Sequence, residues 1–369
     1  MQDVSHTISA LATPETSLSA KQLRLWSAPE VILIVTNFAD EQPLLLEAMH
    51  QAKHSHAKIL LGYVARPSCS RRIGVHGSRQ GRQQSAAHDA QLMLERMSRQ
   101  LRWAGIASEP VLLQGLPAEE IPELVRLRGV NRVIVTTQPD SRASGLGSRA
   151  IAEQILPRVT VPVCIIGGGH TGRAHLATPY SSILLALSPR MKTDVLLDFA
   201  SHLARMHRAA LTVLCSNTPS RWEGQRGSAS SLDTDEPNPL WLVQNARARF
   251  GLETILAEGD LADEALALQR TRQQDLIVLG SERSEFAEWS DAVSSPILVA
   301  RDSQCPVLIL GNALGKKGSD QPLRDLRAGV DDDSECSRIR TNPMERDVVP
   351  MLVPVQETAR ERKHRMENA

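Results

Sequence analysis

Two stretches of this chain share one layout at a constant spacing, and this repetition constrains the fold more than any other feature. Each stretch has a glycine ahead of a helical segment, then an apolar run, then a strand opened by Pro-Val. The paired landmarks lie 144 positions apart: Gly115 and Gly259, residues 131–135 and 275–279, Pro162 and Pro306. Three landmarks at one offset, without a gap, indicate the duplication of a domain of about 140 residues.

Strand and helix patterns alternate within each copy. Val31–Val35 is a continuous apolar run, typical of a strand that is buried on both faces of a parallel sheet. Residues 41–56 follow it with apolar side chains at helical spacing. Strands that alternate with helices of this size form right-handed crossovers. We therefore expect an α/β fold of two tandem doubly wound domains, each with a five-stranded, mainly parallel sheet.

Shifts in composition mark the expected domain limits. They predict a flexible leader over 1–29, a first domain over 30–167, a linker over 168–179, a second domain over 180–311 and a charged, largely disordered tail over 312–369. The tail contains an apolar island at 348–355, which either docks on a protein surface or reflects incidental composition. The loop at 66–84 is rich in arginine, whereas the corresponding loop of the second copy, at 217–239, is acidic. The basic loop either holds an anion or an acidic partner or is a solvated surface loop, and the two loops could attract each other.

Charge and cysteine use exclude several classes of protein. The 42 basic and 42 acidic residues balance, which argues against a general nucleic-acid binder and against anchoring on an anionic membrane. Apolar runs are strand-length, far short of the roughly 20 residues that span a bilayer. The N-terminus lacks a secretory pattern. The five cysteines lack metal-type spacing and are interpreted as reduced residues. We therefore expect a cytoplasmic protein, and the charge balance predicts that it has no nucleic-acid or membrane partners.

With its strand order, the glycine before the third helix and the closing helix–Pro-Val–strand unit, each copy resembles a universal stress protein domain. The resemblance covers about residues 30–166 and 180–311. It implies a Rossmann-like fold of the adenine nucleotide alpha hydrolase type. It also implies that the closing strands, residues 161–166 and 306–310, pair within the chain as a pseudo-dimer, because exposed apolar edge strands need a cover. A further homodimer is left open.

The resemblance also indicates where a nucleotide would bind. Nucleotide-binding members carry Gly-x-x-Gly, nine residues and then Gly-Ser/Thr just after strand four. At these positions the second copy has Gly280, Arg283, Val293 and Ser294, and the first has Thr136, Pro139, Arg149 and Ala150. Glycines let the backbone approach phosphates, and a hydroxyl at a helix start favours an anion. The second copy thus keeps a degenerate motif, whereas the first keeps it only if a two-residue slip brings Gly147 and Ser148 to the helix start.

Polar residues follow the first strand of each copy, where nucleotide-binding relatives place an Asp. Asn37 and Ser188 can hydrogen-bond a ligand there, although both residue types are also common in turns. Arg283 either pairs with a phosphate or is an exposed loop arginine. ATP or AMP is the cofactor that the resemblance implies, and the candidate binding residues are Asn37, Thr136, Gly147, Ser148, Ser188, Gly280, Arg283 and Ser294.

A spacing that is compatible with metal binding lies at the end of the helix 41–56. His50 and His54 are one helical turn apart, with His56 close behind. No carboxylate or cysteine supports them in a recognisable metal motif, and cations are favourable at a helix C-terminus. We therefore expect a solvated helix end and no metal site.

The chain lacks the motifs of common nucleophiles, zinc hydrolases and P-loops, so we expect no enzymatic activity. The first function that the sequence allows is a stress-response binding or regulatory module with a degenerate nucleotide site. The second is a genuine ATP or AMP binder, with or without slow hydrolysis, that uses the second copy. The third is a structural protein that recruits protein partners through its tail. A nucleotide retained through purification would favour the second, and partner capture that depends on residues 311–369 the third.

Overall fold

The computed structural model describes eight ranges of the chain: 19–38, 41–65, 79–137, 151–167, 179–187, 193–216, 251–280 and 295–311. Several sequence predictions lie outside these ranges: the basic loop up to residue 78, the linker over 168–178, the acidic loop and the tail.

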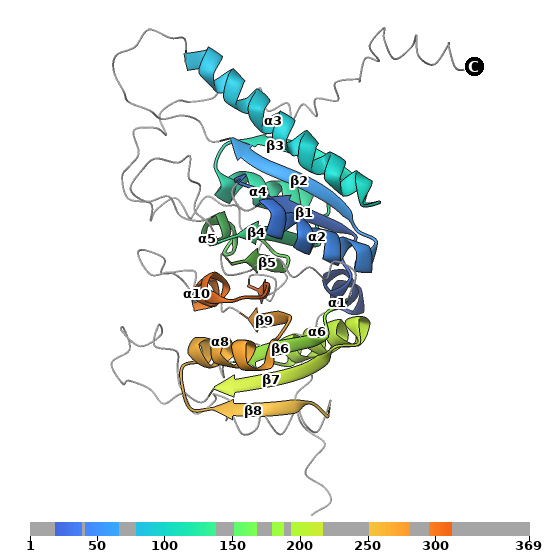
Figure 1. Cartoon of the computed structure of the whole chain (residues 1–369), viewed down its shortest axis with the longest axis vertical. Coiled ribbons are helices and arrows are strands. Elements are labelled where there is room, and N and C mark those ends of the chain that lie inside the picture. Colours follow the sequence, from blue (N-terminus) through green and yellow to red (C-terminus); the bar gives the residue numbers. More distant parts are fainter. Residues whose placement is uncertain are drawn as a thin grey trace, which may run out of the picture. The chain divides into compact units, whose positions relative to one another are not determined.

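The first copy alternates helices and strands in the predicted order (Figure 1). Its strands are β1 (Val31–Val35), β2 (Lys58–Ala65), β3 (Ser108–Gln114), β4 (Arg132–Thr136) and β5 (Val163–Ile166). Its helices are α1 (Ala20–Ser27), α2 (Glu41–Ser55), α3 (Arg79–Trp103), α4 (Pro117–Leu127) and α5 (Ile151–Ile155).

The second copy repeats this succession. Its strands are β6 (Ser182–Leu187), β7 (Ala210–Ser216), β8 (Glu253–Ala257), β9 (Leu276–Gly280) and β10 (Val307–Leu310), and its described helices are α6 (Thr193–His207), α8 (Leu261–Arg272) and α10 (Ser295–Asp302). The described part of both copies therefore has the alternation of strands and helices that the sequence predicts.

All described strands join one ten-stranded sheet in the order β3-β2-β1-β4-β5-β10-β9-β6-β7-β8. Strands within each copy pair in parallel, whereas β5 and β10 pair antiparallel at the centre, with Cys164 opposite Leu308. The expected pairing of the closing strands within one chain is thus observed. It removes the apolar edge that each copy would otherwise expose.

Helices cover both faces of this sheet, as a doubly wound fold requires. Ile32 and Ile34 of β1 enter a core with α2, α3 and α6, whereas Leu33 and Val35 point to the opposite core with α4, α5, α8 and α10. Successive residues of a strand face opposite sides, which explains why the strands read as continuous apolar runs. Both cores contain residues of both copies, so the hydrophobic interior crosses the central β5–β10 pair.

Equivalent residues make equivalent contacts in the two copies. Asn131 accepts hydrogen bonds from the backbone at the start of β1, and Asp275 does the same at the start of β6. Arg128 pairs with Glu109, as Arg272 does with Glu253. These pairs keep the 144-residue offset, so the duplication extends to individual contacts.

The predicted leader and the predicted basic loop are each partly helical. The leader prediction for residues 1–29 is wrong from residue 20 onward, because α1 forms there behind a capping box of Ser19 and Gln22. Trp26 of α1 is buried in the core, and α1 packs beside α6 of the other copy. The loop prediction for 66–84 is wrong from residue 79, where α3 begins. None of the described helices is long and apolar enough to cross a membrane.

Candidate functional site

Three of the candidate nucleotide-binding residues lie in the described part of the chain, and all three stand at the ends of strands. Asn37 follows β1, Thr136 ends β4, and Gly280 ends β9. The carboxyl ends of parallel strands share one edge of a sheet, so these positions face the same kind of crevice in each copy. Thr136 pairs with Ile166 and Gly280 with Leu310, which makes Thr136 and Gly280 structural equivalents.

These strand ends coincide with the topological switch point of each copy. In the first copy the chain runs outward through β2 and β3 and then returns past β1 to β4. In the second copy the same reversal separates β6 from β9. Ligands of open α/β sheets bind in the crevice at this reversal. Asn37 and Thr136 border it in the first copy, and Gly280 borders it in the second.

The turn after β1 is tightly built. The Thr36 hydroxyl accepts a hydrogen bond from the Phe38 amide at 2.9 Å, and Phe38 stacks on Tyr63 with ring centroids 4.6 Å apart. Asn37 and Thr136 are both buried, with 5% and 6% of their surface exposed. The other candidate residues, Gly147, Ser148, Ser188, Arg283 and Ser294, lie outside the described residues.

The histidines of α2 are the main correction to the sequence analysis. His50 is not part of a solvated helix end, because only 7% of its surface is exposed. It contacts His54 with ring centroids 4.9 Å apart, and His54 in turn lies 5.2 Å from His207 of α6. His50, His54 and His207, here called the histidine cluster, bring their ligand nitrogens within 4.8 Å of one another. The cluster joins α2 of the first copy to α6 of the second.

A buried polar network adjoins the histidine cluster. Glu47 of α2 accepts hydrogen bonds from the Gln51 amide at 2.7 Å and from the Tyr180 hydroxyl. Arg132 of β4 donates to the Gln51 carbonyl at 2.9 Å and to the backbone oxygen of Trp26. Tyr180 stands just ahead of β6, so this network also links the two copies.

Burial and local contacts together set the ionisation of these groups. Desolvation would raise the pKa of Glu47, but its interactions with His50, Tyr180 and Gln51 outweigh burial and lower that pKa to about 2. Burial lowers the pKa of His207 to about 3, with smaller electrostatic contributions from its neighbours, among them Arg132. Burial and His50 also lower the pKa of His54. Glu47 is therefore ionised at neutral pH, and His54 and His207 are neutral.

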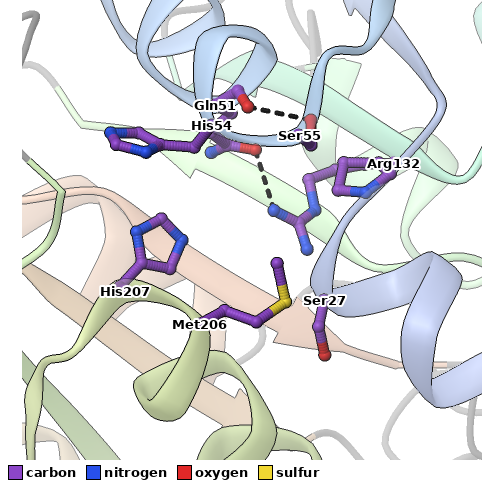
Figure 2. Close-up of a pocket in the computed structure, with 8 residues that line it drawn as sticks. Ser27, Gln51, His54, Ser55, Arg132, Met206 and His207 are labelled. Carbon is purple, nitrogen blue, oxygen red and sulfur yellow. Dashed lines mark hydrogen bonds between the residues drawn. The ribbon is translucent and has the colours of Figure 1, made fainter.

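A small pocket opens beside the cluster (Figure 2). Its lining residues are Ser27, Pro29, Gln51, His54, Ser55, Arg132, Met206 and His207. Figure 2 shows His54 and His207 facing each other across the pocket, with the Arg132 guanidinium directed at Gln51. The arrangement can hold a small polar species between the two copies.

Sequence reasoning missed most of this pocket. It noted the spacing of His50 and His54, but it had no reason to connect them to His207, which is more than 150 residues away. Arg132 gave the one available signal, because a cation at the start of an apolar strand needs buried partners. Tyr180 lies in a segment that the sequence assigned to the beginning of the second domain, with nothing to show that it contacts α2.

Comparisons with known proteins agree with this architecture. The model of the universal stress protein family matches residues 30–167 and again residues 179–311. A universal stress protein structure from Archaeoglobus fulgidus is 17% identical, with a TM-score of 0.53 over 77% of this chain and 98% of that chain. A protein of unknown function from Pseudomonas aeruginosa is 16% identical, with a TM-score of 0.51 over 79% and 96%. At this identity the likeness shows the fold. A search of curated proteins finds no match.

Proposed function

This chain belongs to the universal stress protein family, and we propose that its two domains form a cytoplasmic binding and regulatory module of the stress response. It performs no chemical step. Binding of a ligand or a partner regulates the activity of the module as a whole. The second domain keeps a degenerate site for ATP or AMP, and this site binds the nucleotide more tightly than the site of the first domain.

One observation carries the nucleotide part of the proposal: Gly280 ends β9 at the topological switch point of the second domain. A residue without a side chain at this edge lets phosphate oxygens approach the backbone N–H groups of the following turn. Ser294 immediately precedes α10 in the sequence, the position from which a hydroxyl and a helix N-terminus favour an anion.

The equivalent edge of the first domain is less suited to phosphate. Thr136 takes the place of Gly280, and its branched side chain is buried at a position where the second domain has no side chain. Asn37 keeps hydrogen-bonding capacity at the end of β1, but an amide carries no charge. We therefore expect the two domains to differ in their affinity for nucleotide. Each chain should then have one weak site, which lies in the second domain.

Calorimetric titration of the tag-free full chain with ATP and with AMP, each with and without Mg²⁺, tests the proposal. We expect about one site per chain with a dissociation constant between about 1 μM and 1 mM. Gly280→Val should abolish the heat of binding, because its side chain would occupy the approach of the phosphates. Thr136→Val, at the matched position of the first domain, should leave binding unchanged.

Two results would contradict this account. Absence of binding at millimolar nucleotide would remove the nucleotide site and leave partner recognition as the role of the duplicated fold. Release of phosphate from ATP that is lost in Gly280→Val would establish a chemical step and refute the non-enzymatic assignment.

A further inference from the structure

The histidine cluster is the part of the described structure that the proposed function does not use. Its three imidazoles come from two helices of different domains, α2 and α6, and their ligand nitrogens all lie within 4.8 Å of one another. Four ligands around a tetrahedral zinc ion lie about 3.3 Å apart, given metal–nitrogen distances of about 2.0–2.1 Å. Small side-chain rotations would close the remaining gap.

Two nitrogens of the cluster are buried and have no hydrogen-bond partner among the residues that the structure describes. They are Nε2 of His50 and Nδ1 of His207, and both residues expose only 7% of their surface. A buried polar atom that lacks a partner destabilises the folded state. Two such atoms on facing helices, in a spot where three imidazoles meet, point to a bound species that satisfies both.

The remaining nitrogen of His50 lies near an acid. Nδ1 of His50 lies 3.9 Å from Oε1 of Glu47, and Glu47 is held in turn by Gln51 and Tyr180. A metal-binding histidine commonly directs its second nitrogen at a carboxylate, which fixes the ring and leaves the first nitrogen free as a ligand. Glu47 stands where that second-sphere acid would be.

From this geometry we propose that His50, His54 and His207 bind a divalent transition-metal ion of the zinc class between the two domains. Nε2 of His50 and Nδ1 of His207 are two of the ligands, and His54 supplies the third. Water from the pocket beside His54 and His207 takes the fourth position. Three imidazoles suit zinc, copper or nickel, whereas calcium and magnesium prefer oxygen ligands.

The local charges allow such an ion. Arg132 lines the same pocket, and its positive charge disfavours a cation. The ionised carboxylate of Glu47, which accepts a hydrogen bond from Gln51, offsets that charge, and Arg132 donates its hydrogen bonds to Gln51 and to the backbone oxygen of Trp26. The ion would connect α2 to α6, so that metal binding holds the two domains together. This role is independent of nucleotide binding.

The test uses the full-length, tag-free protein, stripped with EDTA and titrated with Zn²⁺ in the absence of nucleotide. Metal content is measured by mass spectrometry, and Co²⁺ replaces Zn²⁺ to give visible absorption bands that report four-coordination. His207→Ala and His54→Ala remove one ligand each. His88→Ala, which removes an exposed histidine of α3, is the control. Circular dichroism of each metal-free variant shows whether it is folded.

We expect one tightly bound Zn²⁺ per chain, a four-coordinate Co²⁺ spectrum and a melting temperature that rises with Zn²⁺. Affinity should fall at least 10-fold in His54→Ala and His207→Ala, and Glu47→Gln should weaken it by about 10- to 100-fold, as loss of an outer-sphere partner does. His88→Ala should bind as the wild type does. The proposal is overturned if the stripped protein takes up no Zn²⁺, or if folded His54→Ala binds it with unchanged affinity and an unchanged Co²⁺ spectrum.

Discussion

At the scale of single residues, the junction of the two domains is held by polar groups in an apolar setting. Glu47, Gln51 and Arg132 come from the first domain, and Tyr180 supplies the contact from the second. Buried polar groups must be satisfied locally, because leaving one of them without a partner costs about 1–3 kcal/mol. The junction is therefore specific to this pairing of domains, whereas apolar packing alone would tolerate small shifts.

Removing the Tyr180 hydroxyl should destabilise the protein. In Tyr180→Phe, the Glu47 carboxylate loses a buried donor that Phe cannot replace, and we expect the free energy of unfolding to fall by about 1–3 kcal/mol. Tyr63→Phe is the matched control, because Tyr63 is only partly buried and keeps its stacking on Phe38 as Phe; its effect should stay within about 0.5 kcal/mol. Urea unfolding of the metal-free protein measures both. Equal effects of the two substitutions would show that the interdomain hydrogen bond contributes nothing.

At the scale of elements, the sequence predicted those strands and helices that the pattern of apolar residues marks. The apolar runs at 31–35, 131–135 and 275–279 appear, to within one residue, as β1, β4 and β9, because continuous apolar strands are distinctive of parallel sheets. Helix α1 was missed because it has only eight residues, half of which are polar. Short helices are marginal alone, and this one is stabilised by a capping box and by packing against α6, neither of which periodicity reports.

Helix α1 should therefore matter for stability out of proportion to its length. Trp26 is 4% exposed and its backbone oxygen accepts a hydrogen bond from Arg132. Trp26→Ala should lower the free energy of unfolding by about 3–5 kcal/mol, as loss of a buried aromatic side chain does. The control is Trp103→Ala at the end of α3, because Trp103 is 93% exposed; it should change stability by less than about 0.5 kcal/mol. Chemical denaturation followed by circular dichroism measures both, and a Trp26→Ala protein as stable as the Trp103→Ala protein would refute the role given to α1.

At the scale of the whole chain, duplication explains both the fold and the candidate sites. The 144-residue offset was visible in the sequence and predicted two domains, and the resemblance to universal stress proteins implied that they join through their closing strands, as β5 and β10 do. The same offset identified Thr136 and Gly280 as counterparts. It could not identify the histidine cluster, because His50, His54 and His207 do not occupy repeated positions. Their proximity arises only when the two copies fold against each other, so no pattern within one copy encodes it.

The central claim is that the second domain, and not the first, keeps a nucleotide site at its topological switch point. Hydrogen exchange followed by mass spectrometry, with and without millimolar AMP or ATP, tests this directly because it reports where the ligand acts. We predict slower exchange in peptides that cover the ends of β6 and β9, around Leu187 and Gly280, and unchanged exchange around Asn37 and Thr136. Protection confined to the first domain, or exchange that nucleotide leaves unchanged in both domains, would contradict the account.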